Sequence, residues 1–384
     1  GTLTIETDEQ LAAQNITAGN ATLKAGAELT AKNVNVGGNA DITAGTNLTA
    51  NDVSVGGDLN AKGQNIHAVH IKSTGKTRLT ATTGNITAKN LSADGTLDAA
   101  AKTNLTVDSV TGKGKTVLTA QTGDLTVNGT VRTDADAVLT ADKDVTLAGA
   151  FSAKNNARLT AGQNAKLGGK TDVGETLTAH IGKDLVTNGA VITGKELIAN
   201  VGNDLAVNDL VSTGGSASLT VGRNATLGGA LTTGGNFTAN VAHDLTANDA
   251  VTTGADFAAI VGNDAVTNGI VTTNGALKWN VGNDLTTNAA VLSHGTTTID
   301  AQNVKLSADL MSDKNLTITA KNNIFTKEGA NLSTKSDGRL KAHTADLGGD
   351  VRADGTLTIE TDEQLTAQNI TAGNATLKAG AELS

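Results

Sequence analysis

The chain has 384 residues and a formal net charge of −9, and its four Phe, one Trp and no Tyr exclude a core built on large aromatic side chains. It has no Cys, which excludes disulfides, thiolate metal sites and cysteine nucleophiles together. Basic residues are scattered and do not cluster with aromatic ones, so nucleic acid is not an expected partner. No apolar run reaches the roughly 18 residues of a membrane span, and the absence of Pro fits a chain that needs its backbone N–H groups in ladders.

The first part of the chain repeats with a period of 19 residues. Between residues 19 and 60, the segment Gly19–Gly37 reads GNATLKAGAELTAKNVNVG, and Gly38–Gly56 follows it as GNADITAGTNLTANDVSVG. Leu23 therefore corresponds to Ile42 and Val34 to Val53. Residues 61–100 keep the same vocabulary but shift in phase, and we interpret them as irregular coils.

From about residue 105 to residue 319 the period is 20 residues. One apolar column contains Leu185, Leu205, Ala225, Leu245, Ala265 and Leu285; a second contains Val191, Val211, Leu231, Val251, Val271 and Val291; a third contains Ile181, Val201, Val221, Val241, Val261 and Val281. A further column reads Ala239, Ala259, Trp279 and Ile299, in which a bulky ring beside small residues indicates volume compensation in a core. We therefore predict that Trp279 is buried.

Within each repeat, apolar and small polar residues alternate over short runs that turn residues interrupt, which predicts about three short strands per repeat. An up-and-down meander gives no reason for residues 20 apart to match, whereas a parallel β-helix stacks them on one another in successive coils. The predicted fold is thus all-β: one continuous right-handed parallel β-helix over residues 1–384, with coils of about 19–20 residues. The handedness follows the general rule for parallel crossovers.

A second, longer repeat occurs near the beginning and near the end of the sequence. Thr2–Leu29 recurs at Thr356–Leu383 with one change, from Ala12 to Thr366. Diverged coils do not explain such near-identity, but recent duplication of a large block does. We expect an internal fragment of a longer chain in which large blocks follow one another in tandem.

These coils resemble a known family. Asn47–Ala61 reads NLTA-x-x-V-x-x-G-G-x-L-x-A, which is similar to the haemagglutinin repeats of filamentous-haemagglutinin-type exoproteins, the secreted partners of two-partner secretion systems. That group includes adhesins and contact-dependent growth-inhibition proteins. The resemblance implies a right-handed β-helix shaft, export through an outer-membrane transporter and display on the bacterial surface. The family's amino-terminal secretion motif contains Asn-Pro, and this chain has no Pro.

Three sets of polar residues are candidates for a site. An acid/amide column contains Asp184, Asp204, Asn224, Asp244, Asp264 and Asp284. Acid–base catalysis by such carboxylates, or a weak divalent-cation site, competes with the simpler interpretation that they bond to nearby backbone N–H groups at turns, which we favour. GGD occurs singly at Gly56–Asp58 and Gly348–Asp350, without the tandem calcium motif. His67 and His70, three apart on a strand, are expected on opposite faces and thus unable to share a metal.

Two repeated patterns have a purely structural interpretation beside a functional one. Thr193, Thr213, Thr233, Thr253 and Thr273 form a column that is similar to the Thr rows of ice-binding solenoids, but Thr also simply favours strands. N-x-[ST] sequons occur at Asn15, Asn47, Asn104, Asn236 and Asn315, where the repeat itself calls for Asn.

The sequence therefore predicts no catalytic, cofactor or metal residues and no enzyme. The expected function is that of a structural shaft in a secreted, surface-exposed bacterial exoprotein that projects a distal adhesive or effector module. The alternatives are a solenoid face that itself binds glycan or host protein and, as a minor one, an ice-binding solenoid. The expected partners are the outer-membrane transporter and a host or neighbouring-cell receptor contacted through other parts of the chain.

Overall fold

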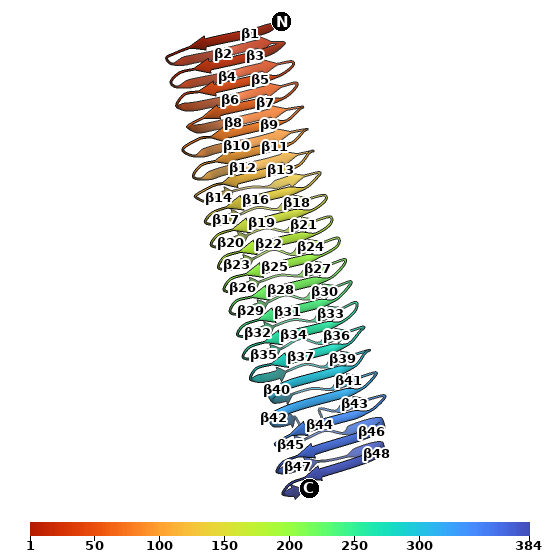
Figure 1. Cartoon of the computed structure of the whole chain (residues 1–384). Helices are drawn as coiled ribbons and strands as arrows, with labels where there is room; N and C mark the ends of the chain where they lie inside the picture. The colour runs from red at the N-terminus through yellow and green to blue at the C-terminus, as the bar shows by residue number, and fades with distance from the viewer. The chain divides into compact units, whose positions relative to one another are not determined.

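The computed structural model describes residues 1–384, which form strands and turns without a helix. The chain divides into two compact units, Gly1–Thr193 (unit 1) and Gly194–Ser384 (unit 2). Each unit is a parallel β-solenoid, and together they contain about 19 turns, stacked coil upon coil within each unit (Figure 1). The predicted all-β solenoid fold is confirmed. The continuity of one solenoid across residues 193 and 194 stays a prediction. No helix in the structure has the length and apolarity to cross a membrane.

A regular coil has three faces, which we name A, B and C in chain order. In unit 2, for example, β25 (Leu197–Val201) lies on face A, β26 (Leu205–Val207) on face B and β27 (Val211–Thr213) on face C. β25 then pairs in parallel with the next face A strand, so that Leu197 stands beside Ala217 and Val201 beside Val221. Residues one repeat apart are therefore neighbours in space, as the sequence columns predicted.

The strands of unit 1 lie on the same three faces, with faces B and C sharing one joined strand per coil up to residue 112 and carrying separate strands from residue 113 onward. On face A are β1 (Thr2–Thr7), β3 (Asn20–Ala25), β5 (Ala40–Ala44), β7 (Leu59–Gly63), β9 (Thr77–Ala81), β11 (Leu97–Ala101), β13 (Thr116–Ala120), β16 (Ala137–Ala141), β19 (Ala157–Ala161) and β22 (Leu177–Ile181). Joined strands on faces B and C are β2 (Leu11–Ala18), β4 (Leu29–Val36), β6 (Asn47–Val55), β8 (Asn65–Ser73), β10 (Ile86–Ala93) and β12 (Leu105–Gly112). Separate face B strands are β14 (Leu125–Val127), β17 (Val145–Leu147), β20 (Ala165–Leu167) and β23 (Leu185–Thr187); face C strands are β15 (Val131–Thr133), β18 (Phe151–Ala153), β21 (Thr171–Val173) and β24 (Val191–Thr193).

Unit 2 begins with regular coils and ends with joined strands. Face A continues with β28 (Ala217–Val221), β31 (Phe237–Val241), β34 (Phe257–Val261), β37 (Leu277–Val281) and β44 (Gly338–Ala342). Face B continues with β29 (Ala225–Leu227), β32 (Leu245–Ala247), β35 (Ala265–Thr267), β38 (Asp284–Thr287), β45 (Thr344–Leu347), β47 (Gln364–Ala367) and β49 (Glu382–Leu383). Face C continues with β30 (Leu231–Thr233), β33 (Val251–Thr253), β36 (Val271–Thr273), β39 (Val291–Ser293), β41 (Leu310–Ser312) and β43 (Leu332–Thr334). β40 (Thr297–Leu306) and β42 (Leu316–Thr326) join faces A and B, whereas β46 (Val351–Thr361) and β48 (Ile370–Ala379) join faces C and A.

The joined strands correct the prediction of three short strands in every coil. In the first coils the corner between faces B and C is turned inside one strand. Asn15, Asn33 and Asp52 occupy this corner with φ of 53°, 53° and 55°. Asn and Asp are the non-glycine residues that most readily adopt this left-handed conformation, so a single residue replaces a separate turn.

Coil length also varies more than the predicted 19–20 residues. Hydrogen-bonded corner residues in neighbouring coils are 18 residues apart at Asn15 and Asn33, 20 apart at Asp144 and Asn164, and 22 apart at Asp309 and Asn331. Residues 61–100, which we interpreted as irregular, form ordinary stacked coils from β7 to β11. Their irregular sequence reflects coils of different length following one another.

The core lies inside each coil and consists of the inward residues of all three faces. Every member of the three predicted apolar columns is buried, with at most 4% of its surface exposed. Trp279 is fully buried, and its column of Ala239, Ala259 and Ile299 is paired in register, so this prediction is confirmed. The Trp279 ring contacts the Phe257 ring edge-on, at a centroid distance of 5.3 Å and an interplanar angle of 74°.

Buried Thr residues in the core are of two kinds. Thr233 and Thr253 donate hydrogen bonds to carbonyl oxygens two residues further on, at 2.9 and 3.0 Å. The hydroxyls of Thr267 and Thr287 are equally buried but have no hydrogen-bond partner. A buried hydroxyl without a partner keeps its desolvation penalty, whereas a bonded one offsets it.

The two kinds of Thr are expected to respond oppositely to removal of the hydroxyl. Thr287→Val should stabilise unit 2 by about 1 kcal/mol, because it removes an unsatisfied polar atom, whereas Thr253→Val should destabilise it by about 1 kcal/mol. Urea denaturation of the two variants beside the parent chain measures the difference. Equal and unfavourable effects at both positions would show that the Thr287 hydroxyl is satisfied after all.

Candidate functional site

The acid/amide column forms a ladder at the corner between faces A and B. Asp204 accepts the backbone N–H of Asn224 at 3.1 Å, and Asn224 accepts that of Asp244 at 3.3 Å. Asp244 and Asp264 continue the ladder by accepting the N–H groups of Asp264 and Asp284 at 3.2 and 3.1 Å. The predicted bonding of these side chains to backbone N–H groups is confirmed, with the difference that the donor lies one coil further on.

Amide side chains of the following coil donate hydrogen bonds to the carboxylates of this ladder. Asn263 donates from Nδ2 to Asp244 at 2.7 Å, and Asn283 does the same to Asp264 at 2.8 Å. Repulsion between like charges is therefore met by hydrogen bonds from the protein itself. No group of three or more His, Cys, Asp or Glu side chains is placed together as a metal would require.

The sequons are members of similar ladders. Asn104 accepts the backbone N–H of Asp124 at 2.9 Å, Asn236 accepts that of Asp256 at 3.0 Å, and Asn15 accepts from the side chain of Asn33 at 2.9 Å. All five sequon Asn residues are exposed. Their recurrence has a structural cause, because a short amide at a corner bonds the next coil.

The structure places His67 and His70 differently from the prediction. Both side chains are exposed. The expectation of opposite faces was wrong because β8 turns the corner between faces B and C at Val69 and His70. Two successive outward residues there lie between the buried Ala68 and Ile71, so the inward–outward alternation is interrupted. The Nδ1 atom of His70 lies 2.9 Å from Nδ2 of Asn90.

The Thr column lies inside the solenoid. Thr193, Thr213, Thr233, Thr253 and Thr273 are at most 3% exposed. Their hydroxyls cannot meet ice or any other external surface. The outward positions beside them hold a mixture of Ile192, Ser212 and three Thr residues, at 232, 252 and 272.

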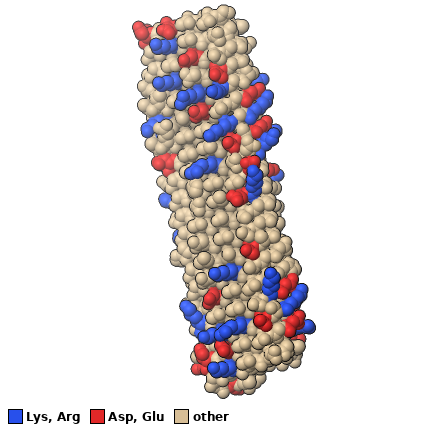
Figure 2. Space-filling view, turned by 45° about the vertical axis from the view of Figure 1, so that its right-hand side comes forward, with Lys and Arg blue, Asp and Glu red and all other residues tan.

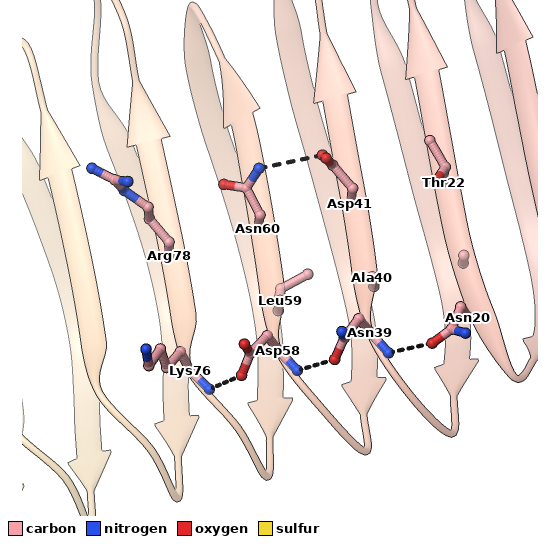
Figure 3. Close-up of a pocket in the computed structure, with 11 residues that line it drawn as sticks. Asn20, Thr22, Asn39, Ala40, Asp41, Asp58, Leu59, Asn60, Lys76 and Arg78 are labelled. Atoms are coloured by element: carbon pink, nitrogen blue, oxygen red, sulfur yellow. Dashed lines mark hydrogen bonds between the residues drawn. The ribbon is translucent and has the colours of Figure 1, made fainter.

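The best candidate site is a groove along face A of unit 1, at β3, β5, β7 and β9 (Figure 3). It has a volume of about 490 Å³ and is lined mainly by two rows of side chains. The corner row contains Asn20, Asn39, Asp58 and Lys76, and the strand row contains Thr22, Asp41, Asn60 and Arg78. The same position further along face A has a second hollow of about 270 Å³, whose lining includes Asp136, Asn156 and Arg158.

The corner row of this groove is fixed by the coils themselves. Asn20, Asn39 and Asp58 each accept the backbone N–H of the next corner residue, at 2.9, 2.9 and 2.7 Å. In the strand row, Asn60 donates to Asp41 at 3.4 Å, and Arg78 lies 3.7 Å from Asp98. The groove thus places carboxylate and amide acceptors beside the cationic donors of Lys76 and Arg78. Of its residues, the sequence singled out only Asp58, as part of the GGD at Gly56–Asp58. The others lie at a repeated spacing in each coil, with a corner residue followed two positions later by an outward strand residue, such as Asn20 and Thr22.

Charges of the two signs are interspersed rather than gathered by sign. Figure 2 shows Lys and Arg interspersed with Asp and Glu on the face drawn. The best-connected pair group lies on unit 2, where Asp313 contacts Nδ1 of His294 at 2.8 Å and Nζ of Lys335 at 2.7 Å. These contacts, first the His294 hydrogen bond and then that of Lys335, lower the pKa of the Asp313 carboxyl below its ordinary 3.8.

Asp313→Asn is expected to destabilise unit 2 above pH 4 and to have a vanishing effect at lower pH. The carboxyl has a lower pKa in the folded chain than in the unfolded one, so its stabilising contribution is full above the unfolded pKa and is lost as the pH falls through the folded pKa. Melting temperatures of both chains from pH 2 to 7 test this, with Asp300→Asn as the control at an exposed carboxylate. A difference between parent and D313N that grows on acidification would contradict it.

The chain matches no protein-family model, no curated protein and no solved structure.

Proposed function

We propose that this chain is a structural shaft segment of a secreted bacterial exoprotein of the filamentous-haemagglutinin type, which carries a distal adhesive or effector module away from the cell surface. The observation that supports this proposal most is the similarity of successive coils. The coils repeat the same core columns and corner ladders, and no connection between strands is longer than the segment 327–331. Such a chain is suited to setting a distance.

The proposed mechanism is geometric. Parallel ladders fix each coil about 4.8 Å from the next, so the number of coils sets the length. Since each coil contacts chiefly its neighbours, stability is close to a sum of local terms, and folding can proceed coil by coil. In this proposal the partners are an outer-membrane two-partner-secretion transporter and a receptor that other parts of the protein contact.

The experiment removes whole coils. Deletion of Ala217–Ala276 joins Ser216 to Leu277, which belongs to the same core column as Ala217. With a reporter binding domain fused after Ser384, this deletion should shorten unit 2 by about 14 Å, at three coils of about 4.8 Å each, and leave the reporter's affinity unchanged. Small-angle scattering and a binding titration measure the two quantities. Loss of the reporter's binding without a change of length would contradict a spacer role.

A second candidate function is adhesion through the solenoid surface, which the face A groove favours. Its rows of carboxylate, amide and cationic side chains suit the hydroxyls of an extended glycan laid across the coils. Glycan-array binding by the purified chain, abolished by Asp41→Ala with Arg78→Ala but not by the distant Asp300→Ala, would support it. A chain that binds no glycan at all would exclude this candidate and leave the shaft proposal standing.

A further inference from the structure

Four Asn residues of this chain are followed directly by Gly, which makes a chemically reactive pair. They are Asn128, Asn188, Asn268 and Asn274. In such a pair the backbone nitrogen of Gly can attack the side-chain carbonyl carbon of Asn, because Gly has no side chain to obstruct the approach and leaves the backbone free to turn. Whether the attack occurs in a folded chain depends on what holds that nitrogen.

The Gly nitrogen is held by hydrogen bonds in two of these pairs. Gly129 donates to the carbonyl oxygen of Asp108 at 2.7 Å. Gly275 donates to the carbonyl oxygen of Ala255 at 3.0 Å and lies 3.3 Å from Oγ1 of Thr273. A hydrogen-bonded N–H group resists both the loss of its proton and the rotation of its peptide plane, so the attack is opposed at these two positions.

The nitrogen of Gly269, in contrast, makes no hydrogen bond. Gly269 lies at the corner between faces B and C in unit 2, between β35 and β36. A Cβ atom there would lie 2.2 Å from the carbonyl carbon of Asp249 in the preceding coil, so the position requires Gly. The side chains of Asn128, Asn268 and Asn274 are all exposed. The three pairs therefore differ chiefly in the state of the Gly nitrogen.

The Asn268 side chain belongs to an amide ladder along this corner. Its Nδ2 donates to Oδ1 of Asn248 at 3.0 Å, and its Oδ1 accepts from Nδ2 of Asn288 at 2.7 Å. A donor on the carbonyl oxygen stabilises the negative charge that develops there when a nucleophile attacks the carbonyl carbon. The ladder thus supports the attack at the same residue whose neighbouring nitrogen is unbonded.

We propose that Asn268 is a site of spontaneous deamidation in the folded chain. The Gly269 nitrogen bonds to Cγ of Asn268, the bond from Cγ to Nδ2 breaks, and the proton of the Gly269 N–H leaves with Nδ2 as ammonia. Water then opens the cyclic imide at one of its two carbonyl carbons. The net reaction consumes water, releases ammonia and replaces the amide by a carboxyl group, without oxidation or reduction. This proposal is independent of the shaft function.

The two products differ in their effect on the solenoid. Opening at Cγ gives aspartate, which such a corner accepts, since Asn128 already donates to Asp108 of the preceding coil at 2.9 Å. Opening at the backbone carbonyl gives isoaspartate, in which the main chain runs through Cγ and is one atom longer between β35 and β36. In both cases an uncharged ladder gains a carboxylate that marks the age of the molecule.

The test compares the three pairs in one sample. The chain is incubated at mildly alkaline pH in water enriched in heavy oxygen, which labels each new carboxyl group, and tandem mass spectrometry of its peptides gives the rate at each Asn. Asn268 should convert about tenfold faster than Asn128 and Asn274, the ratio expected when one hydrogen bond must first be given up. In urea, where all three Gly nitrogens lose their hydrogen bonds, the rates should converge.

Asn268→Gln is the matched control, because it keeps an amide in the ladder but places the carbonyl carbon one bond further from the Gly269 nitrogen. It should abolish the label at this position, and label that persists there would contradict the proposed ring closure. Equal rates at the three Asn residues of the folded chain would overturn the proposal. So would a rate difference that persists in urea, since it would then belong to the local sequence. Fastest conversion at Asn274 would show that the Gly nitrogen does not decide the rate.

Discussion

Trp279→Ala is expected to lower the free energy of unfolding of unit 2 by about 3–5 kcal/mol, the usual cost of deleting a buried aromatic side chain. Trp279 has no exposed surface. Its ring lies against Phe257, and the Phe257 ring lies 5.4 Å from that of Phe237. Of its two register neighbours, Ala259 has no rotatable side chain with which to fill the space and Ile299 is itself fully buried, so the void should persist.

The effect should be local, because coils contact chiefly their neighbours. Hydrogen exchange is expected to speed up in β34, β37 and β40 and to stay unchanged in unit 1. Trp279→Phe is the matched control. It keeps a ring against Phe257 and removes an indole Nε1 that has no hydrogen-bond partner, so its cost should be clearly smaller. An equal loss for both variants would mean that the indole nitrogen is bonded and matters more than the volume.

Removing half a coil is expected to be far more damaging than removing a whole one. Deletion of Ala217–Asn236 takes out one complete coil and joins Ser216 to Phe237, whose column partner is Ala217. Core columns and corner ladders are then restored one coil later, and the chain should fold with a melting temperature within a few degrees of the parent. Deletion of Ala217–Thr226 instead joins Ser216 to Leu227, which replaces a face A strand by the end of a face B strand.

The half-coil variant cannot pair its following strands with those of the preceding coil, because the chain after the junction is half a coil out of phase. The turn at residues 228–230, between β29 and β30, then falls where face A needs a strand. We expect a protease-sensitive region around the junction and a loss of strand signal in circular dichroism. Limited proteolysis of both deletions side by side measures this. Similar resistance in the two variants would show that the coils tolerate a change of phase, and would contradict the core columns as the source of stability.

The sequence predicted most of this fold because, in a solenoid, the repeat length identifies which residues are neighbours in the folded chain. Residues one repeat apart are in contact, so the Val and Leu columns and the burial of Trp279 follow from the spacing alone. The joined strands could not be predicted in this way. Whether a corner needs a turn of several residues or one left-handed Asn, as at Asn33, depends on backbone torsions that no periodicity encodes.

The polar positions were harder to predict than the apolar ones. A short side chain at a corner can bond a local N–H or the N–H of the next coil, and only the structure shows that Asp264 does the latter. His67 and His70 were misplaced because alternation along a strand fails where the strand crosses a corner. The face A groove combines residues from four coils, and its hollow arises from their relative placement rather than from a motif.

The parallel coil also determines how the chain should respond to a pulling force. A coil released from the edge of the stack gives up a thickness of about 4.8 Å and contributes some 20 residues of extended chain, a gain of roughly 60 Å per event. Because each coil leaves behind a neighbour with equivalent ladders, successive ruptures should require similar forces. A molecule held at residues 1 and 384 should therefore lengthen in even steps, and absorb a sudden load over many small breaks.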